Sequence, residues 1–270
     1  MEPISVAGPA GRLTGWIKRG NRPDAVPVLL VHPINMQGRI WAGMVDHLDP
    51  SRTYLMPDLR AHGSSDAVGD FGLEPWTDDL EAVLDHCGVH GAFHVVGGSV
   101  GGSLACVLAG RRPTRAISVA GIGSSLSFEV TDVASVLAVF DELGVAGTFR
   151  KVFPEMTFGP GCATEIVELG LSLANPNDTE TVKRVWHSTI TSDSTAVAMT
   201  LDTTALVLTG SEDATCTPAL GLEMAGVLRT EQTVMPGIGH MPMLECPRRT
   251  AELLERHLEL AERAHSFPNH

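Results

Sequence analysis

The sequence predicts an α/β fold built on a mostly parallel, doubly wound sheet with helices on both faces. Short apolar runs, typical of strands buried on both faces, alternate along the chain with amphipathic stretches of helical periodicity. A chain of 270 residues is also long enough for one large domain with an insertion to bury a full core. Alternation of this kind is typical of βαβ units, and it places functional residues at the carboxyl ends of the strands.

Six apolar runs are the predicted strands of this sheet. The first, 28–31, follows Pro27, is continuously apolar and ends at His32. The other five are 54–56, 93–96, 116–120, 205–208 and 232–235.

Amphipathic or small-residue stretches between these runs are the predicted helices. Apolar residues over 76–87 share one helical face behind Pro75, which suits a first helical position. Small residues over 100–110 predict a helix that lies close to the sheet. Pro247 is expected to open a final helix with a leucine stripe on its buried face.

The alternation stops between residues 121 and 200, where helical patterns occur without an apolar strand. We therefore expect a core formed by 1–120 and 201–270, with 121–200 inserted as a helical cap over the strand ends. Four residues of this cap are candidates to contact a ligand: Phe153, Met156, Phe158 and Trp186. The alternative is that these side chains only hold the cap to the core.

The segment 94–103 is the strongest chemical signal in the chain. A β-branched run leads into Gly-Gly-Ser-Val-Gly, a G-x-S-x-G pattern centred on Ser99, and a helix-prone stretch follows. Strand, turn and helix in this order are typical of a nucleophile elbow, which holds a serine hydroxyl clear of the sheet edge. A similar pattern around Ser172 follows the helix-like stretch 164–169, so we exclude it.

A serine nucleophile needs a base within hydrogen-bond reach and a carboxylate that orients the base. Asp213 follows the predicted strand 205–208, and His240 lies in a glycine-rich loop after the next strand. Both residues are therefore expected at the sheet edge where Ser99 emerges. Glu212 is the alternative acid.

Acyl transfer also needs donors for the oxyanion. The backbone N–H of Val100, directly after the nucleophile, is the first candidate, and that of Ile34 is the second. Pro33 does not interfere, because its missing N–H is not the one required. His32 is expected to form structural hydrogen bonds and not to act as a general base.

At these residues the chain resembles the α/β-hydrolase superfamily, from about Val28 to the last helix, with the cap unmatched. The order Ser, Asp, His is that of the superfamily. The segment 58–66 looks like its D-x-R-G-x-G-x-S motif, with Ala61 where glycine is usual. The segment 240–247 looks like the catalytic-histidine segment.

Within the superfamily, the segment 32–41 is similar in layout to 3-oxoadipate enol-lactonases and related small carboxylic ester hydrolases. The chain departs from these enzymes at Pro33 and Asn35, where small residues are frequent. Gly98 is an unusual residue before the nucleophile, and we expect it to leave extra space beside Ser99.

The resemblance implies a serine hydrolase of a small carboxylic ester or lactone. Ser99 would attack the carbonyl, His240 would carry the proton, Asp213 would orient His240, and water would release the acyl-enzyme. No metal or organic cofactor is implied. The alternatives are a carbon–carbon bond hydrolase of a diketone with the same triad, cofactor-free oxygenation or perhydrolysis, and a non-enzymatic binding protein on the same fold.

The composition of the chain indicates which classes of binding partner and which location to expect. A net charge of −13 argues against nucleic acid, which is recognised by basic surfaces, and weakly favours neutral or apolar substrates. No apolar run is long enough to span a membrane and no secretory signal is visible, so we expect a cytoplasmic location. The five cysteines lack the spacing of a zinc site or a disulfide framework. The oligomeric state is open, a homo-oligomer included.

Overall fold

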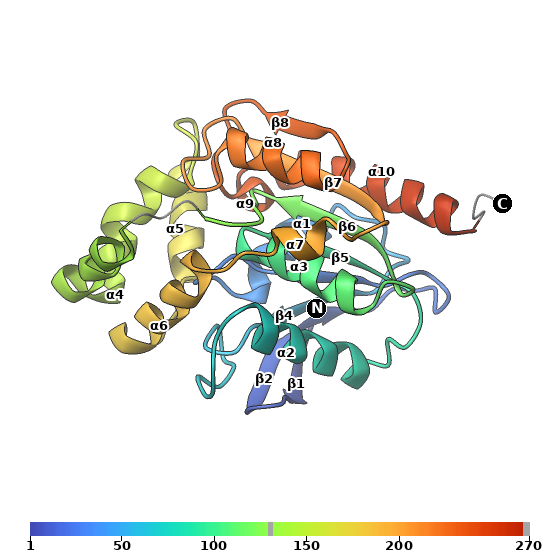
Figure 1. Ribbon diagram of the computed structural model, residues 1–270, viewed down its shortest axis with the longest axis horizontal. Coiled ribbons are helices and arrows are strands. Elements are labelled where there is room, and N and C mark those ends of the chain that lie inside the picture. The colour runs from blue at the N-terminus through green and yellow to red at the C-terminus, as the bar shows by residue number, and fades with distance from the viewer. Residues whose placement is uncertain (129–131, 267–270) are drawn as a thin grey trace.

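The computed structural model describes residues 1–128 and 132–266, and within them eight strands form one sheet. The strands are β1 (Glu2–Ala7), β2 (Arg12–Lys18), β3 (Val28–Val31), β4 (Tyr54–Asp58), β5 (Phe93–Gly98), β6 (Ala116–Ile122), β7 (Thr204–Gly210) and β8 (Gln232–Met235). Their order across the sheet is β1-β2-β4-β3-β5-β6-β7-β8. All pairs from β4 to β8 are parallel, which confirms the predicted sheet (Figure 1).

The first two strands were not among the predicted ones. They pair antiparallel with each other, and β2 pairs antiparallel with β4 at the edge of the sheet. In β2 the buried residues Leu13, Gly15 and Ile17 alternate with less buried ones. This period of two marks a strand with one solvated face, so a search for continuous apolar runs passes over it.

The core helices cover both faces of the sheet. They are α1 (Ala42–Val45), α2 (Leu73–His86), α3 (Val100–Arg111), α8 (Pro218–Val227), α9 (Pro242–Glu245) and α10 (Pro247–Ser266), with a 3-10 turn η1 (Gly38–Trp41). Leu29 and Val31 of β3 pack in the cluster that contains residues of α2, α3 and α8. Val28 and Leu30 pack in the cluster with α1 and α10. Successive residues of β3 therefore face opposite layers, which explains why the whole run is apolar.

One helix boundary differs from the prediction. Helix α2 begins at Leu73, so Pro75 is its third residue and not its first. The N–H of a third residue has no partner inside a helix either, so proline is tolerated there. The final helix begins at Pro247, as expected.

Between β6 and β7 the described chain forms α4 (Val133–Thr157), α5 (Thr164–Ser172), α6 (Thr179–Ile190) and the short α7 (Thr195–Ala198). Figure 1 shows α4, α5 and α6 together at one end of the molecule, opposite the C-terminal end of α10. Helix α4 is broken at Gly144, whose φ of 65° is not helical. Phe140, Phe149 and Phe153 form successive edge-to-face contacts within it.

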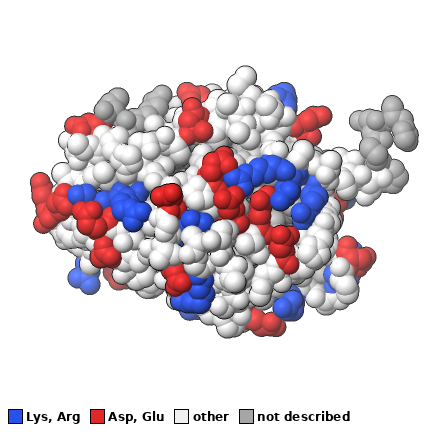
Figure 2. All heavy atoms as spheres, turned by 60° about the horizontal axis from the view of Figure 1, so that its bottom comes forward, with Lys and Arg blue, Asp and Glu red and all other residues white. Residues whose placement is uncertain are grey.

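Several charged side chains on the surface form ion pairs. On the face in Figure 2, acidic and basic residues are intermixed. Arg111 of α3, for example, pairs with Asp78 of α2 at 2.6 Å. No helix within the described ranges has the length and apolar character that a membrane crossing requires.

Arg60 and Asp79 form an ion pair inside the protein, where their side chains are only 6% and 3% exposed. Two hydrogen bonds of 2.6 Å join the guanidinium and the carboxylate. Arg60 also donates to the carbonyl oxygens of Asp70 and Pro75. The pair fastens the loop after β4 to α2.

Three of the buried histidines, His32, His62 and His257, have strongly lowered pKa values and are neutral at pH 7. Burial lowers the pKa of His32 to about 4 and that of His62 to about 3. Burial, followed by the nearby His94, lowers the pKa of His257 to about 3. Each of these side chains therefore takes up a proton more readily in the unfolded chain than in the folded one.

The substitution Asp79→Asn is expected to lower the free energy of unfolding by about 3–5 kcal/mol, because it leaves the Arg60 charge buried without a carboxylate. Urea unfolding measures this loss. The control is Glu252→Gln, which removes a half-exposed partner of Arg249 and should change the free energy by less than about 1 kcal/mol. Equal effects of the two substitutions would contradict the prediction.

Stability is also expected to fall as the pH drops below 6.5. The folded pKa values of these histidines lie below the unfolded value, so protons favour the unfolded chain from pH 6.5 down to about 4 or 3. At pH 5 the loss is about 2 kcal/mol for each histidine. Urea unfolding at pH 7 and pH 5 tests this: His257→Phe should lose about 2 kcal/mol less than the parent over this interval. If His257→Phe and the parent lost the same free energy of unfolding between pH 7 and pH 5, His257 would not be a source of the pH dependence.

Candidate active site

Ser99 lies in the sharp turn between β5 and α3. Its φ of 53° and ψ of −126° are unusual for a residue with a side chain, and it is buried. The Ser99 N–H donates to the Gly123 carbonyl at 3.0 Å, and the Ser99 carbonyl accepts from Ser124 Oγ at 2.6 Å. These bonds hold a strained conformation of the kind found at functional sites.

Glycines make this turn possible. A Cβ atom on Gly97 would lie 1.9 Å from the backbone of Gly101. One on Gly101 would lie 2.4 Å from the carbonyl oxygen of Val31. The strand and the helix therefore cross with their main chains in contact, which explains the glycines of the G-x-S-x-G pattern.

Gly98 does not leave extra space beside Ser99, which corrects our expectation. A Cβ atom at this position would lie 2.9 Å from Pro33 Cγ and 3.0 Å from Met243 Cε. The ring of Pro33 occupies the volume that a side chain at position 98 would need. Pro33, one of the departures from the enol-lactonase layout, and the unusual Gly98 are thus complementary in size.

His240 and Asp213 are brought together from the loops after β8 and β7. His240 Nδ1 lies 2.9 Å from Asp213 Oδ2 and 3.0 Å from Oδ1, and both side chains are buried. The backbone N–H groups of Thr215 and Cys216 donate to Asp213 Oδ1 at 2.9 and 2.8 Å. The carboxylate is therefore fixed in place, and it fixes the imidazole through Nδ1, which is the arrangement that a triad histidine acting as a base through Nε2 would require.

The loop that carries His240 is fastened on both sides. The His240 N–H donates to the Thr157 carbonyl at the end of α4, at 2.6 Å. The Glu245 carboxylate accepts from the N–H groups of Gly159 and Gly239 at 2.8 and 3.0 Å. Sequence patterns gave no role to Glu245, although it lies within the histidine segment.

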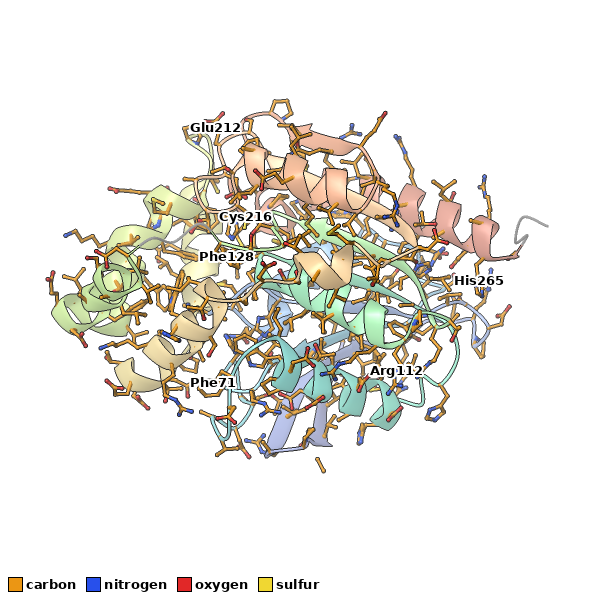
Figure 3. The ribbon with its side chains drawn as sticks, in the orientation of Figure 1. Phe71, Arg112, Phe128, Glu212, Cys216 and His265 are labelled. Carbon is orange, nitrogen blue, oxygen red and sulfur yellow. The ribbon has the colours of Figure 1, made fainter. Side chains whose placement is uncertain are left out.

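Glu212, the alternative acid, lies away from this pair. Its side chain is exposed and accepts a hydrogen bond from Ser211 Oγ at 2.9 Å. Figure 3 shows Glu212 at the outer edge of the molecule, whereas Cys216, close to Asp213 in the chain, lies inside. The observed geometry favours Asp213 over Glu212.

The two candidate oxyanion donors are free to bind a ligand. Among the described residues, neither the Ile34 N–H nor the Val100 N–H donates to another protein group. Val100 is the first residue of α3, and N–H groups of a first helical turn have no partner within the helix. The positive end of the α3 dipole adds to this site's affinity for negative charge.

His32 holds the loop that carries Ile34. Its Nδ1 donates to the Pro33 carbonyl at 2.7 Å, and its Nε2 accepts from the Leu59 N–H at 3.0 Å. Both ring nitrogens are thus occupied, and burial keeps the pKa of the ring near 4. This arrangement matches the structural role expected for His32.

Ser99, His240 and Ile34 line one cavity of about 600 Å³ between the sheet edge and the α4–α6 helices. Phe153, Met156 and Trp186, three of the four expected ligand contacts, also line it. Phe158 does not: it is buried against Phe153, with ring centroids 5.4 Å apart. Its ring contributes to packing, the alternative that the sequence left open.

The lining is mainly apolar. Aromatic and aliphatic side chains come from both the core and the helices, and Figure 3 shows Phe128 where the two meet. Among the described lining residues there is no lysine or arginine, and Glu223 is the one carboxylate. No group of three or more potential metal ligands was found in the described parts of the chain.

Curated proteins with similar sequences include esterases and lipases. The chain is 32% identical to lipase LipV of Mycobacterium tuberculosis over 110 residues, which cover 41% of each protein. It is 31% identical to a pimeloyl-[acyl-carrier protein] methyl ester esterase of Aeromonas hydrophila over 140 residues, 49% of this chain and 51% of the esterase. The matches thus span about half or less of these relatives.

Solved structures of other proteins superpose on this one over nearly the whole chain. An esterase from Thermogutta terrifontis superposes with a TM-score of 0.83 at 22% identity, covering 97% of this chain and 99% of the esterase. The enol-lactonase of Burkholderia xenovorans gives 0.84 at 21% identity, covering 95% and 100%. The family described as alpha/beta hydrolase fold matches residues 26–217. The resemblance drawn from the sequence is confirmed, and the chain belongs to the α/β-hydrolase fold family.

Proposed function

We propose that this protein is a serine hydrolase that cleaves a small carboxylic ester or lactone through an acyl-enzyme on Ser99. The observation that carries the proposal is the buried Asp213–His240 pair, joined at 2.9 Å, with His240 and Ser99 lining the same cavity. Similarity to esterases and a lipase supports the same reaction class.

In the proposed mechanism His240 Nε2 takes the Ser99 proton as the hydroxyl attacks the carbonyl carbon. Asp213 stabilises the imidazolium that forms, and the N–H groups of Ile34 and Val100 stabilise the oxyanion. His240 then protonates the leaving alcohol. Water, activated by His240 in the same way, hydrolyses the acyl-enzyme and frees Ser99.

The cavity lining favours a neutral substrate with apolar parts. A carboxylate buried in it would find no lysine or arginine among the described lining residues, and it would share the cavity with Glu223. Burying an unpaired charge is costly, whereas apolar groups gain from contact with the phenylalanines. In this proposal the helices α4–α6 act as the cap that excludes water from the reaction.

A fluorophosphonate probe tests the nucleophile. We expect one covalent adduct in the intact mass of the native protein and none on Ser99→Ala or His240→Ala. Ser99→Ala should lower kcat for an ester by about 10⁴-fold or more. Circular dichroism controls for folding of the variants. An adduct on Ser99→Ala would place the reactive group elsewhere. If folded native protein formed no adduct, the proposal would be overturned.

Two neighbouring carboxylates allow a matched test of the acid. Asp213→Asn should lower kcat by about 10³- to 10⁴-fold, because the amide cannot stabilise the imidazolium. Glu212→Gln should leave kcat unchanged, since this side chain is exposed and remote. The measurement is kcat for hydrolysis of 4-nitrophenyl butanoate. Turnover of a diketone, measured in parallel, separates ester hydrolysis from carbon–carbon bond hydrolysis. A large loss in Glu212→Gln with activity retained in Asp213→Asn would reverse the assignment.

A further inference from the structure

A second cavity, of about 470 Å³, adjoins the candidate active-site cavity and lies between α4, α5 and the loop that follows α5. We call it the outer pocket, because several of its lining residues are exposed at the surface: Ala146, Arg150, Glu168 and Ser172. Of the described residues, Phe149 is the only one that lines both cavities. Its position therefore decides whether the two cavities are separate or joined.

The periodicity of α4 places Phe149 at the boundary. Val145, Phe149 and Phe153 follow the break at Gly144 and are spaced four residues apart, so their side chains share one face of the helix. Val145 lines the outer pocket and not the active-site cavity, whereas Phe153 lines the active-site cavity and not the outer pocket. Along this face, one cavity gives way to the other at Phe149.

The Phe149 ring is packed on both sides. It makes edge-to-face contacts with Phe140 and Phe153, at centroid distances of 6.3 and 5.9 Å, and both of these residues line the active-site cavity. Phe149 also belongs to the apolar cluster against which Leu171 and Ala174 of the outer pocket pack. Only 7% of Phe149 is exposed. The ring is therefore a closed part of the wall between the two cavities.

A polar contact joins the same two walls elsewhere. Asn175 lines the outer pocket and Asn35 lines the active-site cavity, and the Asn175 N–H donates to the Asn35 carbonyl at 2.8 Å. Asn175 Nδ2 also donates to the Ala61 carbonyl at 2.8 Å. Hydrogen bonds fix this part of the wall, whereas the Phe149 side chain is held by apolar contacts. A substitution at Phe149 is therefore the one that opens the wall without removing a hydrogen bond.

We propose that Phe149 is a specificity-determining residue, whose ring separates the active-site cavity from the outer pocket and so limits the length of the apolar chain of a substrate. The inference rests on the proposed function, in which the ester occupies the cavity of about 600 Å³. Each methylene that enters an apolar cavity gains affinity until the chain meets the ring, and a longer chain has to displace the ring from its contacts. Without the ring, the chain continues into the outer pocket.

Two series of esters test the role of Phe149. The first consists of 4-nitrophenyl esters with unbranched acyl chains from butanoate to dodecanoate, and the second of butanoate esters of unbranched alcohols from ethanol to decanol. The quantity measured is kcat/KM for each ester relative to the shortest member of its series. This ratio cancels differences in the fraction of active enzyme between preparations.

The parent should reach an optimum length in at least one series and decline beyond it. Phe149→Ala should move the optimum to longer chains, with a gain of about fourfold in relative kcat/KM for each methylene that reaches the outer pocket. Phe149→Leu removes less volume and keeps more of the packing, so it should shift the optimum in the same direction by less. It is the second variant if Phe149→Ala does not fold, which circular dichroism reports.

Filling the outer pocket distinguishes a new route from a merely larger cavity. Ala146 lines only the outer pocket and is exposed, so Ala146→Phe should place a ring in that pocket. In the parent this substitution should leave the dependence on chain length unchanged. Combined with Phe149→Ala, it should return the optimum toward that of the parent.

Three outcomes would overturn the proposal: no optimum in either series of the parent, the same optimum in the parent and in the folded Phe149 variants, or a shift in Phe149→Ala that Ala146→Phe does not reduce. The last result would assign the gain to the enlarged cavity alone. In each of these cases, hydrolysis of the butanoates together with a fluorophosphonate adduct would still support the proposed function. Absence of both would remove the two proposals together.

Discussion

The turn at Ser99 exists only because the backbones of β5 and α3 cross in direct contact. A single Cβ atom at Gly97 or Gly101 would overlap the main chain of the facing segment. The same constraint extends into α3, where a Cβ atom on Gly102 would lie 2.0 Å from Ser124 Oγ, the group that holds the Ser99 carbonyl. Helix α3 is buried along most of its length, so the packing of the core and the backbone conformation of Ser99 depend on the same small residues.

The segment between β6 and β7 is tied to the core at both ends of the candidate site. On one side, the Thr157 carbonyl and the Gly159 N–H bind the His240 N–H and the Glu245 carboxylate. On the other side, Asn175 bonds to Asn35, which follows the candidate oxyanion donor Ile34, and to the carbonyl of Ala61, a residue with a positive φ. A displacement of α4 or α6 would therefore reach the His240 loop and the Ile34–Asn35 segment through separate hydrogen bonds.

Local patterns predicted the parts of this molecule that local forces determine. The apolar runs located the six parallel strands, because a strand buried on both faces has to be apolar throughout. The spacing of Asp213 and His240 after strands indicated that they would lie together, and they do, while their catalytic roles stay predictions. The sequence could not show that Pro33 fills the space beside Gly98, or that Asn175 orients Asn35 across 140 positions. Both depend on which distant segments meet in the folded chain, and no short pattern records that.

The fit of Pro33 against Gly98 also restricts the paths by which this site can change over generations. A side chain introduced at position 98 first would collide with the proline ring and with Met243. A smaller residue at position 33 first would leave a cavity, which costs stability without blocking the fold. Substitution at position 33 before position 98 is therefore the accessible order. A larger residue at position 98 is expected to follow, and not to precede, a smaller one at position 33.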